Sequence, residues 1–284
     1  MTQTVTPELR QWIADQAKVG ADPEVVLKSL LDTGWHREAV IDEMRQIWRG
    51  LHEEHPAAQP APVPVMRVPE PLPEGGIPSA LLVDGREVRV IAAMRLPRVV
   101  VFGNLLSHEE CDALIALARP RMARSDVVSV TTGGSEIHAA RTSDGMFFQR
   151  GENEICQRIE ARLATLLGWP LENGEGLQVL HYRPGAEYKP HYDYFDPKEK
   201  GTPSILQRGG QRVATVVMYL NDAKVGGGTT FPDVNFEVAP VKGNAVFFSY
   251  DKAHSSSRTL HGGAPVVEGE KWIATKWLRE GEFR

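Results

Sequence analysis

A histidine and an aspartate stand two positions apart in residues 188–195, whose sequence is YKPHYDYF. The run is rich in aromatic residues and is typical of a β-strand, on which side chains two positions apart share a face. His191 and Asp193 are therefore expected to point the same way. An imidazole and a carboxylate presented together are two potential metal ligands, although a His-X-Asp triplet is also common by chance.

A third candidate ligand, His261, opens the later segment LHGGAPVVEGEKWIATKW. Two glycines follow it and allow the backbone to approach a neighbouring strand closely. Two histidines and one carboxylate form the facial triad of non-haem iron(II) oxygenases, which leaves positions open for substrate and O₂. Zinc could bind the same three side chains, so the triad alone does not establish redox chemistry.

A lysine follows His261 on the next expected strand. If that strand alternates, Lys271, Ile273, Thr275 and Trp277 share one face and Lys276 lies on the other. A lone lysine is more often a solvated surface residue. Inside a barrel that also holds a metal, however, Lys271 would suit a cosubstrate that carries a carboxylate.

Short strands must position these side chains. Residues 176–280 contain apolar and β-branched runs separated by Gly, Pro, Asn and Asp, which favour a β-sandwich or small barrel, with a jelly roll (double-stranded β-helix) as the leading architecture. Two helices are expected before them, at 107–118 and 152–167; the first opens with Ser-His-Glu-Glu, a capping-box sequence. The fold class is therefore mainly β with flanking helices.

The N-terminal part differs in composition. Residues 1–54 contain three short amphipathic helical patterns and predict a small helical accessory module. Residues 55–78 are rich in proline and predict a semi-rigid linker, because proline favours extended polyproline II geometry. Residues 79–284 remain for the catalytic domain. The module is either a stabilising appendage or a recruiter of an unknown protein partner.

Composition excludes several classes. A net charge of −5 argues against a dedicated nucleic-acid binder. No apolar run is long enough to span a bilayer and the first residues do not form a secretory signal, so we expect a cytoplasmic protein that does not enter membranes. Cys111 and Cys156 lie in amphipathic helical patterns, where they are expected to act as small apolar side chains rather than as a disulfide.

Residues 97–280 resemble the catalytic domain of the prolyl 4-hydroxylases, especially their short bacterial and algal members. Three segments carry the resemblance: LQVLHYRPGAEYKPHYDYF, GGQRVATVVMYLNDAKVGGGTTFPD and LHGGAPVVEGEKWIATKWLRE. The resemblance implies Fe(II)- and 2-oxoglutarate-dependent hydroxylation of peptidyl proline, with O₂ as cosubstrate, succinate and CO₂ as products, and ascorbate as an optional reductant. A proline-containing peptide or protein would be the substrate.

Carried over by position, the resemblance implies three groups of site residues. The iron ligands would be His191, Asp193 and His261. The residues that bind 2-oxoglutarate would be Lys271, Tyr182 and Thr229. The residues that contact the peptide would be Tyr188, Arg212, Trp277 and Arg141.

Other interpretations stay open at this stage. The same iron chemistry could act on a free amino acid or another small molecule, or the fold could be a non-catalytic binding or regulatory protein. The presence of Asp193 disfavours a halogenase, since related halogenases have a small residue there. Residues 196–210 are expected to form a mobile flap. The other histidines of the domain are interpreted as surface or loop residues: His108, His138, His181 and His254.

Overall fold

The computed structural model describes residues 5–18, 23–54, 67–124, 127–128, 135–136 and 142–284. The chain divides into two compact units, Met1–Pro64 and Val65–Arg284, and each is described by itself. Arg141 and His138, both named from the sequence, lie outside the described residues. Among the described helices, none combines the length and the apolar character that crossing a membrane requires.

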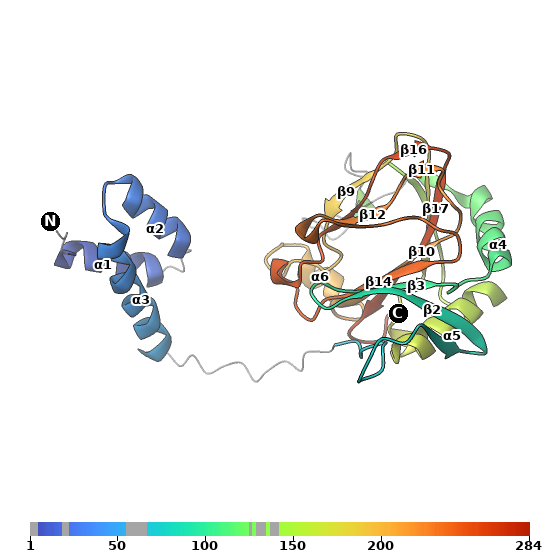
Figure 1. Ribbon diagram of the computed structural model, residues 1–284, viewed down its shortest axis with the longest axis horizontal. Coiled ribbons are helices and arrows are strands. Elements are labelled where there is room, and N and C mark those ends of the chain that lie inside the picture. Colours follow the sequence, from blue (N-terminus) through green and yellow to red (C-terminus); the bar gives the residue numbers. More distant parts are fainter. Residues whose placement is uncertain (1–4, 19–22, 55–66, 125–126, 129–134, 137–141) are drawn as a thin grey trace. The chain divides into compact units, whose positions relative to one another are not determined.

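Three helices form the N-terminal unit, as predicted: α1 (Pro7–Lys18), α2 (Pro23–Asp32) and α3 (Arg37–Glu54) (Figure 1). Proline occupies the first position of α2, where a missing backbone N–H costs nothing. The chain leaves α2 through Gly34, whose φ of +94° favours glycine. The helices pack around a shared apolar core: Ile13, Val26, Leu27, Leu30, Val40 and Met44.

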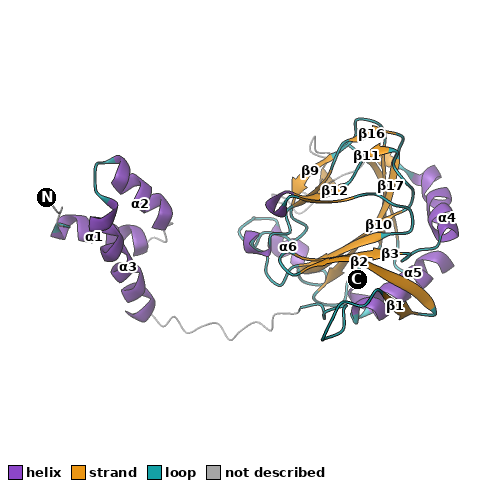
Figure 2. Cartoon of the chain, in the orientation of Figure 1, coloured by secondary structure: helices purple, strands orange, loops and turns teal. Residues whose placement is uncertain are grey.

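The C-terminal unit is a jelly roll of two antiparallel sheets (Figure 2). The larger sheet contains, in spatial order, β1 (Ala80–Val83), β2 (Arg86–Met94), β3 (Arg98–Gly103), β14 (Ala245–Ser249), β10 (Arg212–Tyr219), β17 (Lys271–Arg279), β8 (Leu177–Tyr182), β7 (Asp144–Phe148) and β4 (Ala123–Arg124). The smaller sheet contains β13 (Phe236–Val238), β12 (Thr229–Phe231), β15 (His261–Gly263) and β9 (Tyr188–His191).

Shorter elements complete this unit. Two ribbons pair β11 (Val225–Gly226) with β16 (Val266–Glu268) and β5 (Val127–Val128) with β6 (Ser135–Glu136). Single 3₁₀ turns occur at Arg119–Arg121, Leu171–Asn173, Pro232–Val234 and Ser255–Ser257.

The central strands of the larger sheet are buried on both faces. Along β3, Val100 and Phe102 join the apolar cluster under two helices, α4 (His108–Ala118) and α5 (Glu154–Leu167). Val99 and Val101 join the cluster that lies between the two sheets. This alternation follows from the period of two along a strand. The capping box predicted at the start of α4 is present.

The strand β17 carries a lysine to each face. Lys271 belongs to the side that faces the smaller sheet. Lys276 faces the helices, where its Nζ lies 2.6 Å from Oε1 of Glu160 on α5. Both lysines are about 2% exposed. The alternation predicted for this strand is therefore present, and neither lysine is a solvated surface residue.

The folded unit begins earlier than residue 79, the start expected from composition. Val68 is fully buried and Leu72 nearly so, and both belong to the cluster under the helices. Arg98 at the start of β3 fixes this segment: it pairs with Glu70 at 3.0 Å and donates hydrogen bonds to the carbonyls of Val68 and Pro69. The proline-rich composition hid these contacts, because they form with residues distant in sequence.

One further expectation needs correction, and one segment contains a helix that was not expected. His181 is buried rather than exposed on a loop: it lies on β8, stacks on Trp272 with ring centroids 4.1 Å apart, and has Nε2 2.7 Å from Glu270. The segment 196–210 contains a short helix, α6 (Thr202–Leu206), with Thr202 buried. The hydroxyl of Thr202 donates to the carbonyl of Asp196 at 2.6 Å, which links the start of the segment to the start of α6.

Candidate active site

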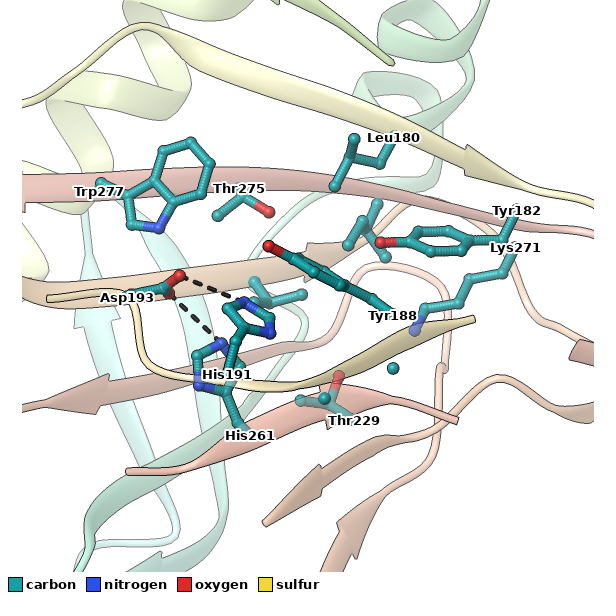
Figure 3. Close-up of a pocket in the computed structure, with 14 residues that line it drawn as sticks. Leu180, Tyr182, Tyr188, His191, Asp193, Thr229, His261, Lys271, Thr275 and Trp277 are labelled. Atoms are coloured by element: carbon teal, nitrogen blue, oxygen red, sulfur yellow. Dashed lines mark ion pairs between the residues drawn. The ribbon is translucent and has the colours of Figure 1, made fainter. Parts of the chain in front are cut away.

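Two strands of the smaller sheet bring the predicted iron ligands together. His191 ends β9 and His261 begins β15, and the ladder places the two residues directly opposite each other. Asp193 lies in a bend two residues past β9, not on the strand as predicted. Its Oδ1 is 3.5 Å from Nε2 of His191 and its Oδ2 is 3.4 Å from Nε2 of His261 (Figure 3). The three ligand atoms all lie within 4.8 Å of one another.

Backbone carbonyls orient both imidazole rings. Nδ1 of His191 is 3.0 Å from the carbonyl of Lys189, and Nδ1 of His261 is 2.9 Å from the carbonyl of Thr259. A carbonyl can only accept, so each Nδ1 carries the hydrogen and each Nε2 presents its lone pair to the site. Burial, together with the charge of His261, lowers the pKa of His191, which keeps this ring neutral and able to bind a metal.

The carboxylate of Asp193 completes this donor set. Burial alone would raise its pKa, but the attraction of His261 and of the neighbouring His191 ring holds the pKa of Asp193 well below its ordinary value, so the carboxylate is ionised. Two imidazole lone pairs and a carboxylate oxygen then face one another in a buried space. They repel each other unless a cation lies between them, and a set of two histidines and one carboxylate fits iron(II).

A buried cation lies at the other end of the same pocket. Lys271 pairs with Tyr182 of β8 across the ladder, and its Nζ is 5.2 Å from the Tyr182 ring centroid. Burial lowers the pKa of Lys271 to about 8, against a smaller opposing effect of Glu237. No hydrogen bond or ion pair joins its ammonium group to another residue in the described ranges. Because a buried charge without a counter-ion is costly, Lys271 is suited to receive an anionic ligand.

Thr229 lies on the same side of the pocket. Its Oγ1 accepts a hydrogen bond from the hydroxyl of Tyr219 at 2.8 Å, so its own hydroxyl hydrogen remains for a ligand. Burial raises the pKa of Tyr219, which keeps that phenol protonated as the donor. A molecule with a 2-oxo acid at one end and a carboxylate at the other, such as 2-oxoglutarate, matches the metal ligands at one end and Lys271 with Thr229 at the other.

The space between these groups is one pocket. Its empty volume is about 410 Å³, a figure that includes the solvent-filled space at its open mouth. Eight of the ten site residues named from the sequence line it (Figure 3). The lining consists of Leu180, Tyr182, Tyr188, His191, Asp193, Val217, Thr229, His261, Gly262, Gly263, Lys271, Ile273, Thr275 and Trp277.

Arg212 occupies a different position from the other predicted peptide contacts. It does not line the pocket but pairs with Glu175 through two hydrogen bonds of 2.7 and 3.0 Å. Its guanidinium carbon lies 3.9 Å from the Trp277 ring centroid, so it stacks on that indole. Arg141, the fourth predicted contact, lies outside the described residues.

Several residues of the site were not anticipated from the sequence. Glu175 and Tyr219 support Arg212 and Thr229 as described above. Thr215 donates a hydrogen bond of 2.7 Å to Oδ2 of Asp193, and its Oγ1 is 3.1 Å from the hydroxyl of Tyr250. A threonine within an apolar strand looks ordinary, because threonine is common in strands. The sequence did contain one signal for Thr215: it alternates with Val217 and Tyr219, so the three side chains share one face of the strand.

Known proteins resemble this chain over the same region. A family model described as the 2OG-Fe(II) oxygenase superfamily matches residues 177–279. Prolyl 4-hydroxylase 5 of Arabidopsis thaliana is 44% identical over 209 residues, which cover 66% of this chain and 70% of that protein. Prolyl 4-hydroxylase 1 of the same plant is 45% identical over 202 residues, which cover 65% and 69%.

A solved structure agrees with these relatives. The viral collagen prolyl hydroxylase of Paramecium Bursaria Chlorella virus-1, solved as its 2OG complex, superposes with a TM-score of 0.50 at 30% identity. The match covers 64% of this chain and 95% of the viral chain. With this similarity, and with a pocket that fits iron and 2-oxoglutarate, the chain belongs to the prolyl 4-hydroxylase family of 2-oxoglutarate- and Fe(II)-dependent oxygenases.

Proposed function

We propose that this protein hydroxylates proline residues in peptides or proteins, using Fe(II), 2-oxoglutarate and O₂. One observation carries the proposal: Lys271, a buried ammonium that no described residue pairs with, shares a single pocket with a three-ligand metal centre. The family to which the chain belongs supplies the reaction that such a pocket serves. An idle barrel on the same fold has no need of a complete ligand set, so the non-catalytic interpretation is disfavoured.

Each residue of the pocket then has a defined task. His191, Asp193 and His261 would hold the iron, and Lys271 with Thr229 would hold the distal carboxylate of 2-oxoglutarate. When bound, iron and 2-oxoglutarate would supply the oxidising power: one oxygen atom of O₂ would enter the substrate C–H bond and the other would enter succinate, which forms from 2-oxoglutarate with release of CO₂. The protein contributes orientation and a dry environment, and no side chain has to act as a general base.

Aromatic side chains favour a prolyl ring at the mouth of the pocket. Tyr188 stacks on His191 with ring centroids 3.8 Å apart, and Trp277 lies on the opposite wall. The indole N–H of Trp277 is buried and has no acceptor among the described residues. In Figure 3 this nitrogen lies on the edge of the ring that faces Asp193, where it could donate to a peptide carbonyl. Phe147, about half exposed, extends the aromatic wall; its ring centroid lies 6.4 Å from that of Trp277.

These features favour a peptide over free proline as the substrate. A free amino acid carries two charges next to its ring, whereas the side chains that form the aromatic wall, Tyr188, Trp277 and Phe147, are uncharged. An extended peptide has neutral amides there, which can receive the Trp277 N–H. Arg212 stacks on this indole, while its guanidinium pairs with Glu175, which also pairs with Arg279.

The test is coupled turnover in the full-length protein. Anaerobically prepared protein is mixed with Fe(II), 2-oxoglutarate and ascorbate, exposed to O₂, and assayed for succinate with a prolyl peptide, the same peptide with alanine for proline, or free proline. We expect succinate formation to match the appearance of a peptide heavier by one oxygen atom. Equal coupling with free proline, or no dependence on proline in the peptide, would contradict the proposed substrate.

A further inference from the structure

A hydrogen-bonded chain of two hydroxyl groups ends on the carboxylate of the metal site. Thr215, in the middle of β10, has its Oγ1 2.7 Å from Oδ2 of Asp193 and 3.1 Å from the hydroxyl oxygen of Tyr250. Thr215 is fully buried, and Asp193 and Tyr250 are nearly so. Bulk water therefore does not compete for the hydrogen bonds between these three groups.

The direction of each hydrogen bond follows from the groups involved. An ionised carboxylate only accepts, so Thr215 must use its single hydroxyl hydrogen toward Asp193. The threonine oxygen then has lone pairs but no further hydrogen, so Tyr250 must be the donor in the second bond. Only one arrangement of the two hydrogen bonds remains. Tyr250 donates to the hydroxyl oxygen of Thr215, and Thr215 donates to Oδ2 of Asp193.

Packing does not account for the threonine. It lies on a strand whose eight residues are all buried, and it stands opposite Trp277 on β17. Valine has nearly the same shape and would fill this site without a polar atom. A buried hydroxyl is unfavourable unless it is hydrogen-bonded. The hydroxyl of Thr215 is therefore explained by its hydrogen bond to Asp193 rather than by packing in the core.

We propose that Thr215, held by Tyr250, is a positioning residue that makes Asp193 bind iron through one oxygen only. The hydrogen bond uses one lone pair of Oδ2, which also lies 3.4 Å from Nε2 of His261, and so favours Oδ1 as the oxygen that binds the metal. A carboxylate bound through both oxygens would take one of the positions that 2-oxoglutarate and O₂ need. The inference rests on the iron role of the triad and not on the identity of the oxidised substrate.

The experiment compares full-length Thr215→Val, Thr215→Ser and Tyr250→Phe with the parent protein. Each is loaded with Co(II), whose visible d–d absorption reports coordination number, first without and then with 2-oxoglutarate. In Thr215→Val we expect a changed spectrum before 2-oxoglutarate is added, and affinity for 2-oxoglutarate weaker by roughly tenfold or more, the usual scale for partners of metal ligands. Serine should restore both, and Tyr250→Phe should change both in the same direction to a smaller extent.

Lys271→Met is the matched control. It removes the partner of the distal carboxylate, so it should weaken 2-oxoglutarate binding while leaving the Co(II) spectrum without 2-oxoglutarate unchanged. A parent-like spectrum and affinity in Thr215→Val would overturn the proposal, as would a folded Thr215→Ser that behaves like the valine variant. If the valine variant does not fold, Tyr250→Phe decides: a parent-like spectrum and affinity there would reject the hydroxyl chain. None of these outcomes depends on whether the substrate is a prolyl peptide.

Discussion

The lowered pKa of Lys271 makes a quantitative prediction about 2-oxoglutarate binding. An ordinary lysine, with a pKa near 10.4, stays charged up to pH 9. Burial lowers the pKa of Lys271 to about 8, so this ammonium loses most of its charge between pH 7 and pH 9. If only the charged form binds the distal carboxylate, affinity is full below pH 7 and is lost as the pH rises through 8.

The size of the effect follows from that pKa. With a pKa near 8, about nine-tenths of the lysine is protonated at pH 7 and about one-tenth at pH 9, so the apparent affinity falls about tenfold between them. Binding also favours the charged form, because the bound carboxylate supplies the missing counter-ion. Near pH 8 each bound 2-oxoglutarate should therefore take up about half a proton.

Isothermal titration calorimetry measures both quantities. Protein loaded anaerobically with Mn(II) is titrated with 2-oxoglutarate at pH 7, 8 and 9 in two buffers of different ionisation enthalpy, which reveals proton uptake. Lys271→Arg is the control, because arginine keeps its charge throughout this range. A flat affinity in the parent protein, or the same pH dependence in Lys271→Arg, would refute the role given to Lys271.

Three further predictions concern the metal site and the scaffold. His191→Ala should abolish metal binding and turnover while the near-ultraviolet circular dichroism stays that of a folded protein, since apolar clusters hold the sheets together; a loss of that signal would instead make the site part of the scaffold. Glu160→Gln should lower the free energy of unfolding by about 3–5 kcal/mol, because it leaves the ammonium of Lys276 buried without its charged partner, and an unchanged denaturation midpoint would show that the pair is dispensable. A chain shortened to begin at residue 79 should be less stable than one that begins at residue 65 by about 3–6 kcal/mol, the combined contribution of burying Val68 and Leu72; equal stability in urea would show that the segment packs without stabilising.

The sequence predicted the metal ligands better than it predicted their setting. The two-residue spacing of His191 and Asp193 and the glycines after His261 identified the triad, and alternation on one strand distinguished Lys271 from Lys276. Asp193 nevertheless reaches the site from a bend after the strand. Its position depends on contacts with β10, a strand whose register no local pattern reveals.

Other expectations failed for the same physical reason. His181 was interpreted as a surface residue, yet it stacks on Trp272, which is its partner across the ladder. Val68 and Leu72 occur among prolines, and composition predicted a semi-rigid linker there, whereas distant helices and strands bury them. Local patterns report which face of an element is apolar. They do not report which distant residue will meet that face.

The two buried lysines of β17 also affect how the sheet assembles. If this strand paired with its neighbours one residue out of step, every side chain would move to the opposite face. Lys271 would then enter the apolar layer beneath the helices, and Lys276 would leave Glu160 for the pocket. The shift would leave the buried ammonium of Lys276 without its charged partner, which costs more than misplacing an apolar side chain. The lysine positions of β17 therefore disfavour the wrong strand register. What excludes that register is the cost of burying an unpaired charge, not a difference in side-chain shape.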